Sequence, residues 1–214
     1  LLALVEIPAL GVPGDILNQD HFANLAEAMV TEMIDRDRHH PSVVAWGLGD
    51  NLDSSDPRTC GYVEKLSDIA KKLDTRPVYF GSFAFVDERC AGKADIAAVR
   101  LTSTGSGSLK SVLRSWKSDN GEQPVVLLGY GKDVEPENRN GWSDPMSQEA
   151  QAEYFKKTYA VIKEAKIAGS FIDAFADWKG DRPLMTIGTG DRDMVPLCLL
   201  SAAREKLASF DMVK

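Results

Sequence analysis

The strongest constraint on the fold is the alternation of short apolar runs with longer amphipathic stretches along the whole chain. The runs are rich in Val, Ile and Leu and show little alternation of apolar with polar residues. This pattern is typical of parallel strands that are buried on both faces. The six runs are residues 2–7, 42–48, 77–80, 95–101, 124–128 and 169–175.

Between these runs, apolar residues recur at helical spacing. The predicted helices are residues 19–37, 60–73, 108–118, 148–165 and 195–210. Strands separated by helices form βαβ units with right-handed crossovers and a parallel sheet. The units fit either a doubly wound sheet or most of an eight-stranded barrel. No dinucleotide-binding signature follows the first run, and Gly105-x-Gly107 lacks the required third glycine. We therefore predict one α/β domain over residues 1–214.

Polar and aromatic residues gather directly after several of the predicted strands. They are Glu6, Asp50 with Asn51, Tyr130, and Asp177 with Trp178. In a barrel the carboxyl ends of the strands form the functional face. The pattern therefore predicts a site at this end of the sheet.

Charge and composition exclude some functions and leave others open. Twenty-five basic residues stand against 32 acidic ones, a net charge of −7. Without a basic stripe we expect no nucleic-acid partner, and no apolar segment has the length of a membrane span. The chain opens on a strand-like run without Met, so we expect it to be part of a longer protein.

The chain has three cysteines, Cys60, Cys90 and Cys198, which lie far apart in the sequence and form no C-x-x-C pair. We interpret them as three buried or partly buried thiols, because free cysteine is among the most buried residue types. Their number and spacing leave the cellular compartment open.

Several segments carry specific motifs. Residues 4–8 read Leu-Val-Glu-Ile-Pro, and residues 33–51 contain His-Pro-Ser and end in Trp-Gly-Leu-Gly-Asp-Asn. Residues 124–133 contain Gly-Tyr-Gly, residues 151–154 read Gln-Ala-Glu-Tyr, and residues 169–178 end in Phe-Ala-Asp-Trp. These segments resemble, in order, the D-E-I-P, R-D-x-N-H-P-S-I-x-x-W-S-L-G-N-E, P-I-I-x-T-E-Y-G-A-D, Q-A-E-Y and G-x-x-x-W-N-F-A-D-F motifs of glycoside hydrolase family 2, the β-galactosidase and β-glucuronidase group. The resemblance implies a TIM-type (β/α)8 barrel, with this chain spanning roughly strands 3 to 8.

The resemblance also implies retaining hydrolysis by two carboxyl groups, one acting as acid and base and the other as nucleophile. The family's acid/base is the Glu of G-N-E, and the matching position here is Asn51. The nucleophile is the Glu of T-E-Y-G, and the matching position is Gly129. An amide transfers no proton at useful pH and glycine has no side chain, so neither position supplies its group.

Other carboxylates could replace the missing pair. Asp50 stands one residue before the acid/base position, and Asp173 takes the place of the family's tryptophan on the last strand. These two are the fallback catalytic candidates. Asp133 could also reach the barrel mouth, as could Glu6 and Asp177.

The aromatic and acidic residues near the strand ends are candidate sugar contacts. The predicted substrate-binding residues are Glu6, Trp46, Tyr130, Asp177 and Trp178. Trp142 lies in a loop rich in Gly, Asn and Pro, so we expect it to be exposed and available to a partner or glycan.

The histidines His21, His39 and His40 suggest turn or surface positions. Their spacing matches no zinc motif, and we predict neither a metal nor another cofactor.

Three functional hypotheses follow. The first is a catalytically inactive, carbohydrate-related barrel that acts as a binding or scaffold domain. The second is an active O-glycosyl hydrolase with a displaced acid and nucleophile, and the third is another barrel enzyme that uses the strand-end acids. The expected partners are a carbohydrate ligand and either other domains of the same protein or a second copy at the open barrel edge.

Overall fold

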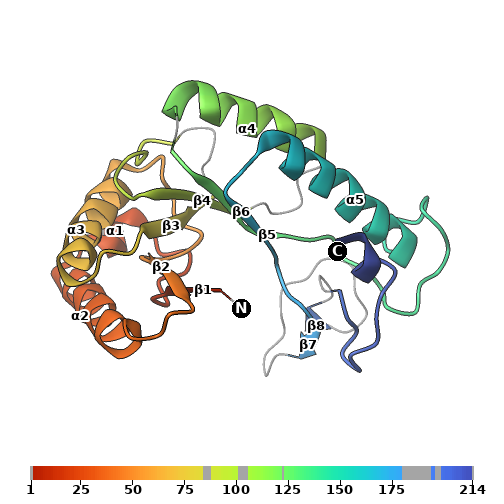
Figure 1. Cartoon of the computed structure of the whole chain (residues 1–214), viewed down its shortest axis with the longest axis horizontal. Coiled ribbons are helices and arrows are strands. Elements are labelled where there is room, and N and C mark those ends of the chain that lie inside the picture. The colour runs from red at the N-terminus through yellow and green to blue at the C-terminus, as the bar shows by residue number, and fades with distance from the viewer. Residues whose placement is uncertain are drawn as a thin grey trace. The chain divides into compact units, whose positions relative to one another are not determined.

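The computed structural model describes residues 2–83, 88–100, 106–121, 123–179, 194–195 and 199–213. All six predicted strands are present in this part of the chain (Figure 1). They are β1 (Ala3–Glu6), β2 (Val43–Gly47), β3 (Val78–Ser82), β4 (Ile96–Arg100), β5 (Val125–Tyr130) and β6 (Gly169–Ile172).

The strands follow one another in the sheet in chain order, β1-β2-β3-β4-β5-β6. The pairings of β1 with β2, β2 with β3 and β3 with β4 are parallel. This order, with helices in the connections, is that of a TIM-type barrel, and it confirms the predicted fold class. A doubly wound sheet would instead reverse its strand order part-way.

Four of the five predicted helices are confirmed. They are α2 (Asp20–Asp37), α3 (Pro57–Leu73), α4 (Ser106–Asn120) and α5 (Gln148–Ala165), and a short α1 (Gly14–Leu17) precedes them. Asp56 caps α3 by accepting a hydrogen bond from the Arg58 amide, with Pro57 in the first turn. Ser147 caps α5 in the same way through the Ala150 amide. No helix among the described residues is both long and apolar enough to cross a bilayer.

The predicted helix at residues 195–210 is wrong. Residues 199–209 form turns and isolated bridges, followed by the 3₁₀ helix η1 (Phe210–Val213). Leu200 pairs with Ala176 and with Lys206, and Arg204 has a positive φ of 65°. The apolar spacing therefore reflects separate buried contacts of Leu199, Leu200 and Leu207 rather than one helical face. Two short strands not predicted from sequence, β7 (Trp178–Lys179) and β8 (Met194–Val195), pair antiparallel.

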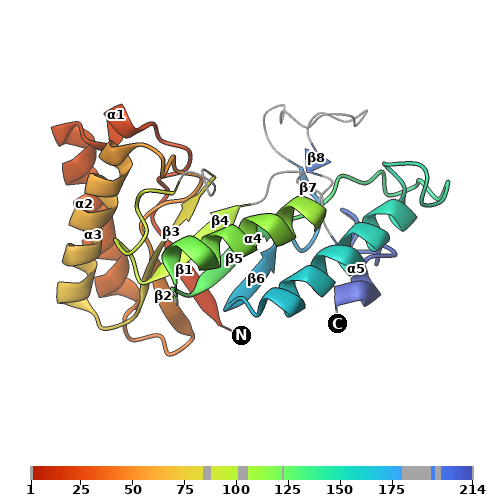
Figure 2. The same ribbon diagram turned by 90° about the horizontal axis from the view of Figure 1, so that it is seen from above.

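The chain divides into two compact units. The first comprises Leu1–Arg100 with Arg114–Leu127, and the second comprises Leu101–Leu113 with Leu128–Lys214. In the first unit, α2 and α3 lie side by side against the strands (Figure 2). Their apolar faces form one buried cluster with β2 and β3 that includes Val30, Ile34, Trp46, Val63 and Leu66. In the second unit, Phe155 of α5 packs edge-on against Tyr130 of β5, with ring centroids 5.8 Å apart.

The interpretation of three free thiols is wrong for two of the cysteines. Cys60, in the first turns of α3, forms a disulfide with Cys90, and their Cα atoms are 4.8 Å apart. Both residues are buried. Their separation in sequence hid this pairing, because only the fold brings the start of α3 beside the segment that precedes β4. Cys198 lies outside the described residues.

We predict that this disulfide stabilises the first unit measurably. It links residues separated by 30 positions, and closing a loop of that length should contribute about 3–4 kcal/mol through the entropy of the unfolded chain. In urea denaturation, the Cys60→Ala/Cys90→Ala double variant should have a free energy of unfolding that is lower by about this amount. Cys198→Ala is the control. It should leave unchanged the difference in unfolding free energy between the oxidised and the reduced protein. Three reactive thiols in the unfolded, non-reduced protein would contradict the pairing.

Candidate functional site

Four polar side chains that lie far apart in sequence meet near the ends of β1, β2 and β4 and on β3. Glu6 ends β1, Asp50 follows β2, Tyr79 lies in β3 and Arg100 ends β4. All four belong to the first unit. Two interactions, each of which passes over an intervening strand, hold them together.

The first interaction joins Tyr79 to Glu6, whose carboxylate Oε2 accepts a hydrogen bond of 3.0 Å from the tyrosine hydroxyl. The two residues flank Gly47, which is paired with both in the sheet. A Cβ at Gly47 would clash with the Glu6 side chain and lie 2.7 Å from the end of the Tyr79 ring. The bond therefore depends on a glycine at the position where the family motif W-S-L-G-N-E has serine.

The second interaction is an ion pair between Asp50 and Arg100. The guanidinium donates from Nε to Asp50 Oδ2 at 2.9 Å, and Nη2 donates to the same oxygen. The other carboxylate oxygen, Oδ1, accepts the Asn51 amide at 2.7 Å. Only 4% of the Asp50 side chain is exposed, so this carboxylate is buried with three N–H donors around it.

The backbone around Asp50 is fixed as well. The Asp50 amide donates to Ala9, and its carbonyl accepts from Gly11. Gly49 has a φ of 141° and Asn51 a φ of 54°. Asparagine tolerates this left-handed conformation better than most residues do. The turn therefore ends on the half-buried side-chain amide of Asn51.

The Glu6 carboxyl group lies close to both Asp50 and Arg100. Its pKa is raised by burial and by the nearby charge of Asp50, while the Tyr79 hydrogen bond and the charge of Arg100 oppose the rise. Glu6 nevertheless remains exposed to solvent. Burial also raises the pKa of Tyr79, which keeps its hydroxyl a hydrogen-bond donor.

Trp46 was predicted to contact a sugar, and the structure contradicts this. Its ring is fully buried in the core of the first unit, with the Arg76 guanidinium 5.5 Å from the ring centre. Side chains alternate between the faces of a strand, so Trp46 points away from the face on which Gly47 lies between Glu6 and Tyr79. The ring therefore offers no face to a ligand.

The candidates of the second unit occupy different environments. Gly129 is buried in β5, and Tyr130 is buried against Phe155 with a hydrogen bond to Ser170. Asp173 is exposed, and Asp177 is 6% exposed. The side chain of Trp178 lies outside the described residues.

Of the remaining candidates, Asp133 is partly buried, and burial raises its pKa. The three histidines are exposed, as predicted.

Three residues of this cluster were not predicted from sequence: Tyr79, Arg100 and Gly47. Arg100 could have been recognised as a charge directly after four residues of an apolar strand run. The role of Gly47 requires knowledge of the register, because only pairing with Glu6 and Tyr79 shows why a side chain is excluded.

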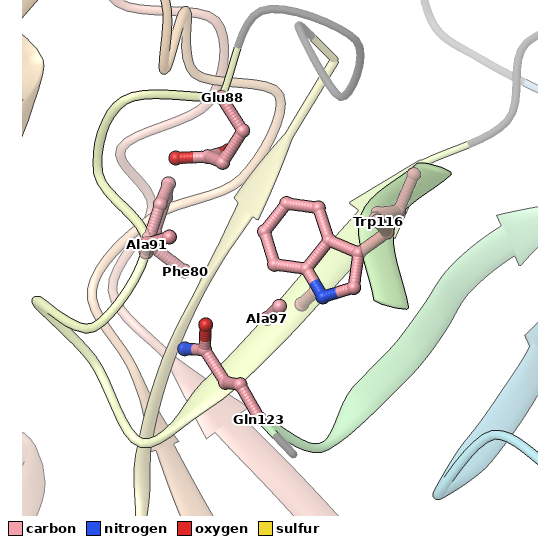
Figure 3. A pocket seen from close by; sticks show the side chains of 8 residues that line it. Phe80, Glu88, Ala91, Ala97, Trp116 and Gln123 are labelled. Carbon is pink, nitrogen blue, oxygen red and sulfur yellow. The ribbon is translucent and has the colours of Figure 1, made fainter. Parts of the chain in front are cut away.

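A small cavity also lies in the first unit, between Trp116 of α4 and Ala97 of β4, with Glu88 and Gln123 nearby (Figure 3). Its volume of about 10 Å³ has room for roughly one water molecule. A sugar ring does not fit, so this cavity is not part of the candidate site.

Comparison with known proteins identifies the family. The model for "Glycosyl hydrolases family 2, TIM barrel domain" matches residues 16–205. The chain belongs to this family. The β-glucuronidase of Streptococcus agalactiae is 23% identical over 178 residues, covering 75% of this chain and 30% of the relative. The mouse β-glucuronidase is 25% identical over 206 residues, covering 88% of this chain and 31% of the relative. The family 2 domain therefore spans about a third of the length of these curated relatives.

Solved structures agree on the fold. A family 2 β-galacturonidase from Eisenbergiella tayi bound to galacturonate superposes with a TM-score of 0.87 at 19% identity, covering 99% of this chain and 39% of that one. The Bifidobacterium dentium β-glucuronidase, complexed with coumarin-3-O-glucuronide, gives a TM-score of 0.88 at 18% identity, covering 100% and 36%. The family 2 fold is thus kept at low identity.

We predict that restoring the family serine, in the variant Gly47→Ser, breaks the Tyr79–Glu6 hydrogen bond and destabilises the protein. The added atoms have no space between the two side chains, and overpacking of this kind costs about 1–3 kcal/mol. Urea denaturation measures the loss. Gly61→Ser is the matched control, because Gly61 is exposed on α3 with only the Asn18 side chain 3.9 Å from an added Cβ. Equal stability of the Gly47→Ser variant and the wild type would contradict the packing argument.

Proposed function

We propose that this family 2 barrel domain is catalytically inactive and acts as a carbohydrate-binding or scaffold domain. The proposal rests on the turn after β2. The position that matches the family's acid/base holds Asn51, and the neighbouring Asp50 is engaged by Arg100 and by the Asn51 amide. Gly129, at the position that matches the nucleophile, has no side chain to attack a sugar carbon.

Asp50 is a poor substitute for the missing acid. A general acid must reach the glycosidic oxygen and transfer its proton. Asp50 is almost completely buried, and both of its oxygens already accept N–H donors. Delivering a proton from this position would require breaking the ion pair with Arg100.

The alternative, an active O-glycosyl hydrolase with a displaced pair, has one observation in its favour. Glu6 is exposed to solvent, and its pKa is raised. A raised pKa is a property of general acids in glycosidases. A second carboxyl group at about 5–5.5 Å or about 6.5–9.5 Å would be needed to complete a retaining or inverting pair. Asp50 is the carboxylate whose charge acts on Glu6, but its ion pair opposes a catalytic role.

We predict no turnover above the buffer rate for nitrophenyl β-galactoside, β-glucuronide, β-mannoside and β-glucoside. Loss of acid assistance alone costs about 10²–10⁴-fold, and loss of the nucleophile removes the retaining route. Release of nitrophenol is followed for the wild type and for Glu6→Gln, Asp50→Asn and Asp173→Asn. Turnover by the wild type that one of these variants abolishes would show a displaced site and overturn the proposal.

We also propose that the chain is one domain of a longer protein, in which other residues or a second copy cover the edges of the sheet. In the sheet of the described residues, β1 and β6 stand at the two ends and have one strand neighbour each. Leu2, before β1, is 70% exposed, and Phe171 of β6 is 41% exposed. Apolar strand edges of this kind favour association.

This arrangement predicts that the chain by itself associates in solution. Light scattering after size-exclusion chromatography should show dimers or larger species. The Leu2→Lys/Phe171→Lys double variant should shift them toward monomer, because a lysine on an edge disfavours strand addition. Leu25→Lys, on an exposed position of α2, is the control. A wild-type monomer at concentrations of about 100 μM would contradict edge association.

A further inference from the structure

The loop between β5 and α5, residues 131–147, carries the most exposed large hydrophobic side chain of the described residues. Trp142 is 80% exposed. The loop follows the carboxyl end of β5, which is the end at which barrels of this type bind ligands. Loops on a rigid scaffold frequently supply binding residues.

Two buried glutamines at the start of α5 hold this loop in place. The Gln148 side chain donates from Nε2 to the Pro136 carbonyl, and the backbone N–H of Gln148 donates to the Asn138 carbonyl at 3.0 Å. Gln151 donates to the Lys132 carbonyl at 3.1 Å. Their side-chain oxygens accept hydrogen bonds from the Ala208 amide and from the Ser209 hydroxyl. Buried amides with these partners fix the loop and the C-terminal segment onto α5.

Asp144 orders the part of the loop that contains Trp142. Its Oδ2 accepts from the side-chain amides of Asn138 and Asn140 at 3.1 and 3.0 Å, and its Oδ1 accepts from the Met146 amide at 2.9 Å. These bonds, with that of Asn140 first, lower the pKa of Asp144. Ser147 donates to the Gly141 carbonyl at 2.6 Å. The backbone on both sides of Trp142 is therefore held before any ligand arrives, which reduces the entropy cost of binding.

The surroundings of Trp142 favour a sugar over a protein partner. No other large hydrophobic side chain of this loop is exposed among the described residues, whereas Arg139, Asn140 and Ser143 are exposed polar neighbours in sequence. A protein interface typically covers about 800 Å² on each partner, with several anchors. One aromatic ring among amides and hydroxyls instead matches a single pyranose, which has an apolar C–H face and a rim of hydroxyls.

Charge narrows the class of sugar. Residues 131–147 contain two basic side chains against four acidic ones, a net charge of −2. Arg139 is already engaged, because its guanidinium pairs with Glu149 at 2.8 Å and donates to Gln148 at 2.9 Å. The negative charge of the loop would therefore repel a carboxylate on the sugar. Arg139 is not available to form the paired hydrogen bonds that an arginine makes to a carboxylate.

We propose that Trp142 and its loop form a binding site for a neutral sugar residue of a glycan, with the indole stacking on the ring. The inference rests on the proposed carbohydrate-binding function and adds the contact residue and the class of sugar. It requires no catalytic group, and it places the contact on the loop that follows the family's nucleophile strand.

The test measures the affinity of the full chain for tetrasaccharides of β-1,4-linked glucose, mannose and galactose, and for tetragalacturonate, by isothermal titration calorimetry. We expect at least one neutral tetrasaccharide to bind about tenfold more tightly than tetragalacturonate. Trp142→Ala should weaken that binding by about tenfold or more, and Trp142→Phe by only about two- to threefold, because an aromatic face remains. Leu25→Ala, which shortens another exposed apolar side chain, should change nothing.

Two results would overturn this inference in different ways. If Trp142→Ala binds the neutral tetrasaccharide as well as the wild type, the loop is not the contact, while carbohydrate binding by the domain still stands. If the wild type binds none of the four tetrasaccharides, both this inference and the carbohydrate-binding part of the proposed function fail. Trp142→Ala could also keep the sugar affinity of the wild type but self-associate less. That result would assign the loop to a protein interface and exclude the sugar site. Unchanged thermal melting of Trp142→Ala confirms that the fold is intact.

Discussion

The polar cluster of the first unit depends on two side-chain interactions, and each of them passes over an intervening strand. The Tyr79–Glu6 hydrogen bond joins β3 to β1, and the Asp50–Arg100 ion pair joins the end of β4 to the turn after β2. Both arise because the parallel register brings polar side chains of distant segments together near the carboxyl ends of β1, β2 and β4. The absence of a side chain at Gly47 makes the first link possible, and burial of Asp50 makes the second costly to break.

These links bear directly on chemistry. A retaining glycosidase needs one carboxyl group that can exchange a proton and another that can attack. In this chain the buried carboxylate is committed to an arginine, and the exposed one, Glu6, is bonded to a tyrosine. The turn after β2 carries the amide side chain of Asn51 directly after this buried carboxylate. The same barrel scaffold is compatible with binding, since fold alone does not determine activity.

The second unit carries the loop of the proposed sugar site. Gln148 and Gln151 hold a long loop on α5, and Asp144 orders the part of the loop next to the exposed Trp142. A pre-ordered loop requires little further ordering when a ligand binds.

The sequence by itself determined the six strands, four of the helices and the family, because doubly apolar runs and helical stripes are local patterns that tertiary contacts reinforce. From the spacing of the motifs, it also predicts that Asn51 and Gly129 stand at the family's catalytic positions. Only the tertiary structure decided that Trp46 is buried, that Arg100 engages Asp50, and that Cys60 pairs with Cys90. Each of these depends on register or on contacts between distant segments. The helix expected at residues 195–210 failed for the same reason, because apolar spacing does not reveal whether one helical face or several separate contacts bury the side chains.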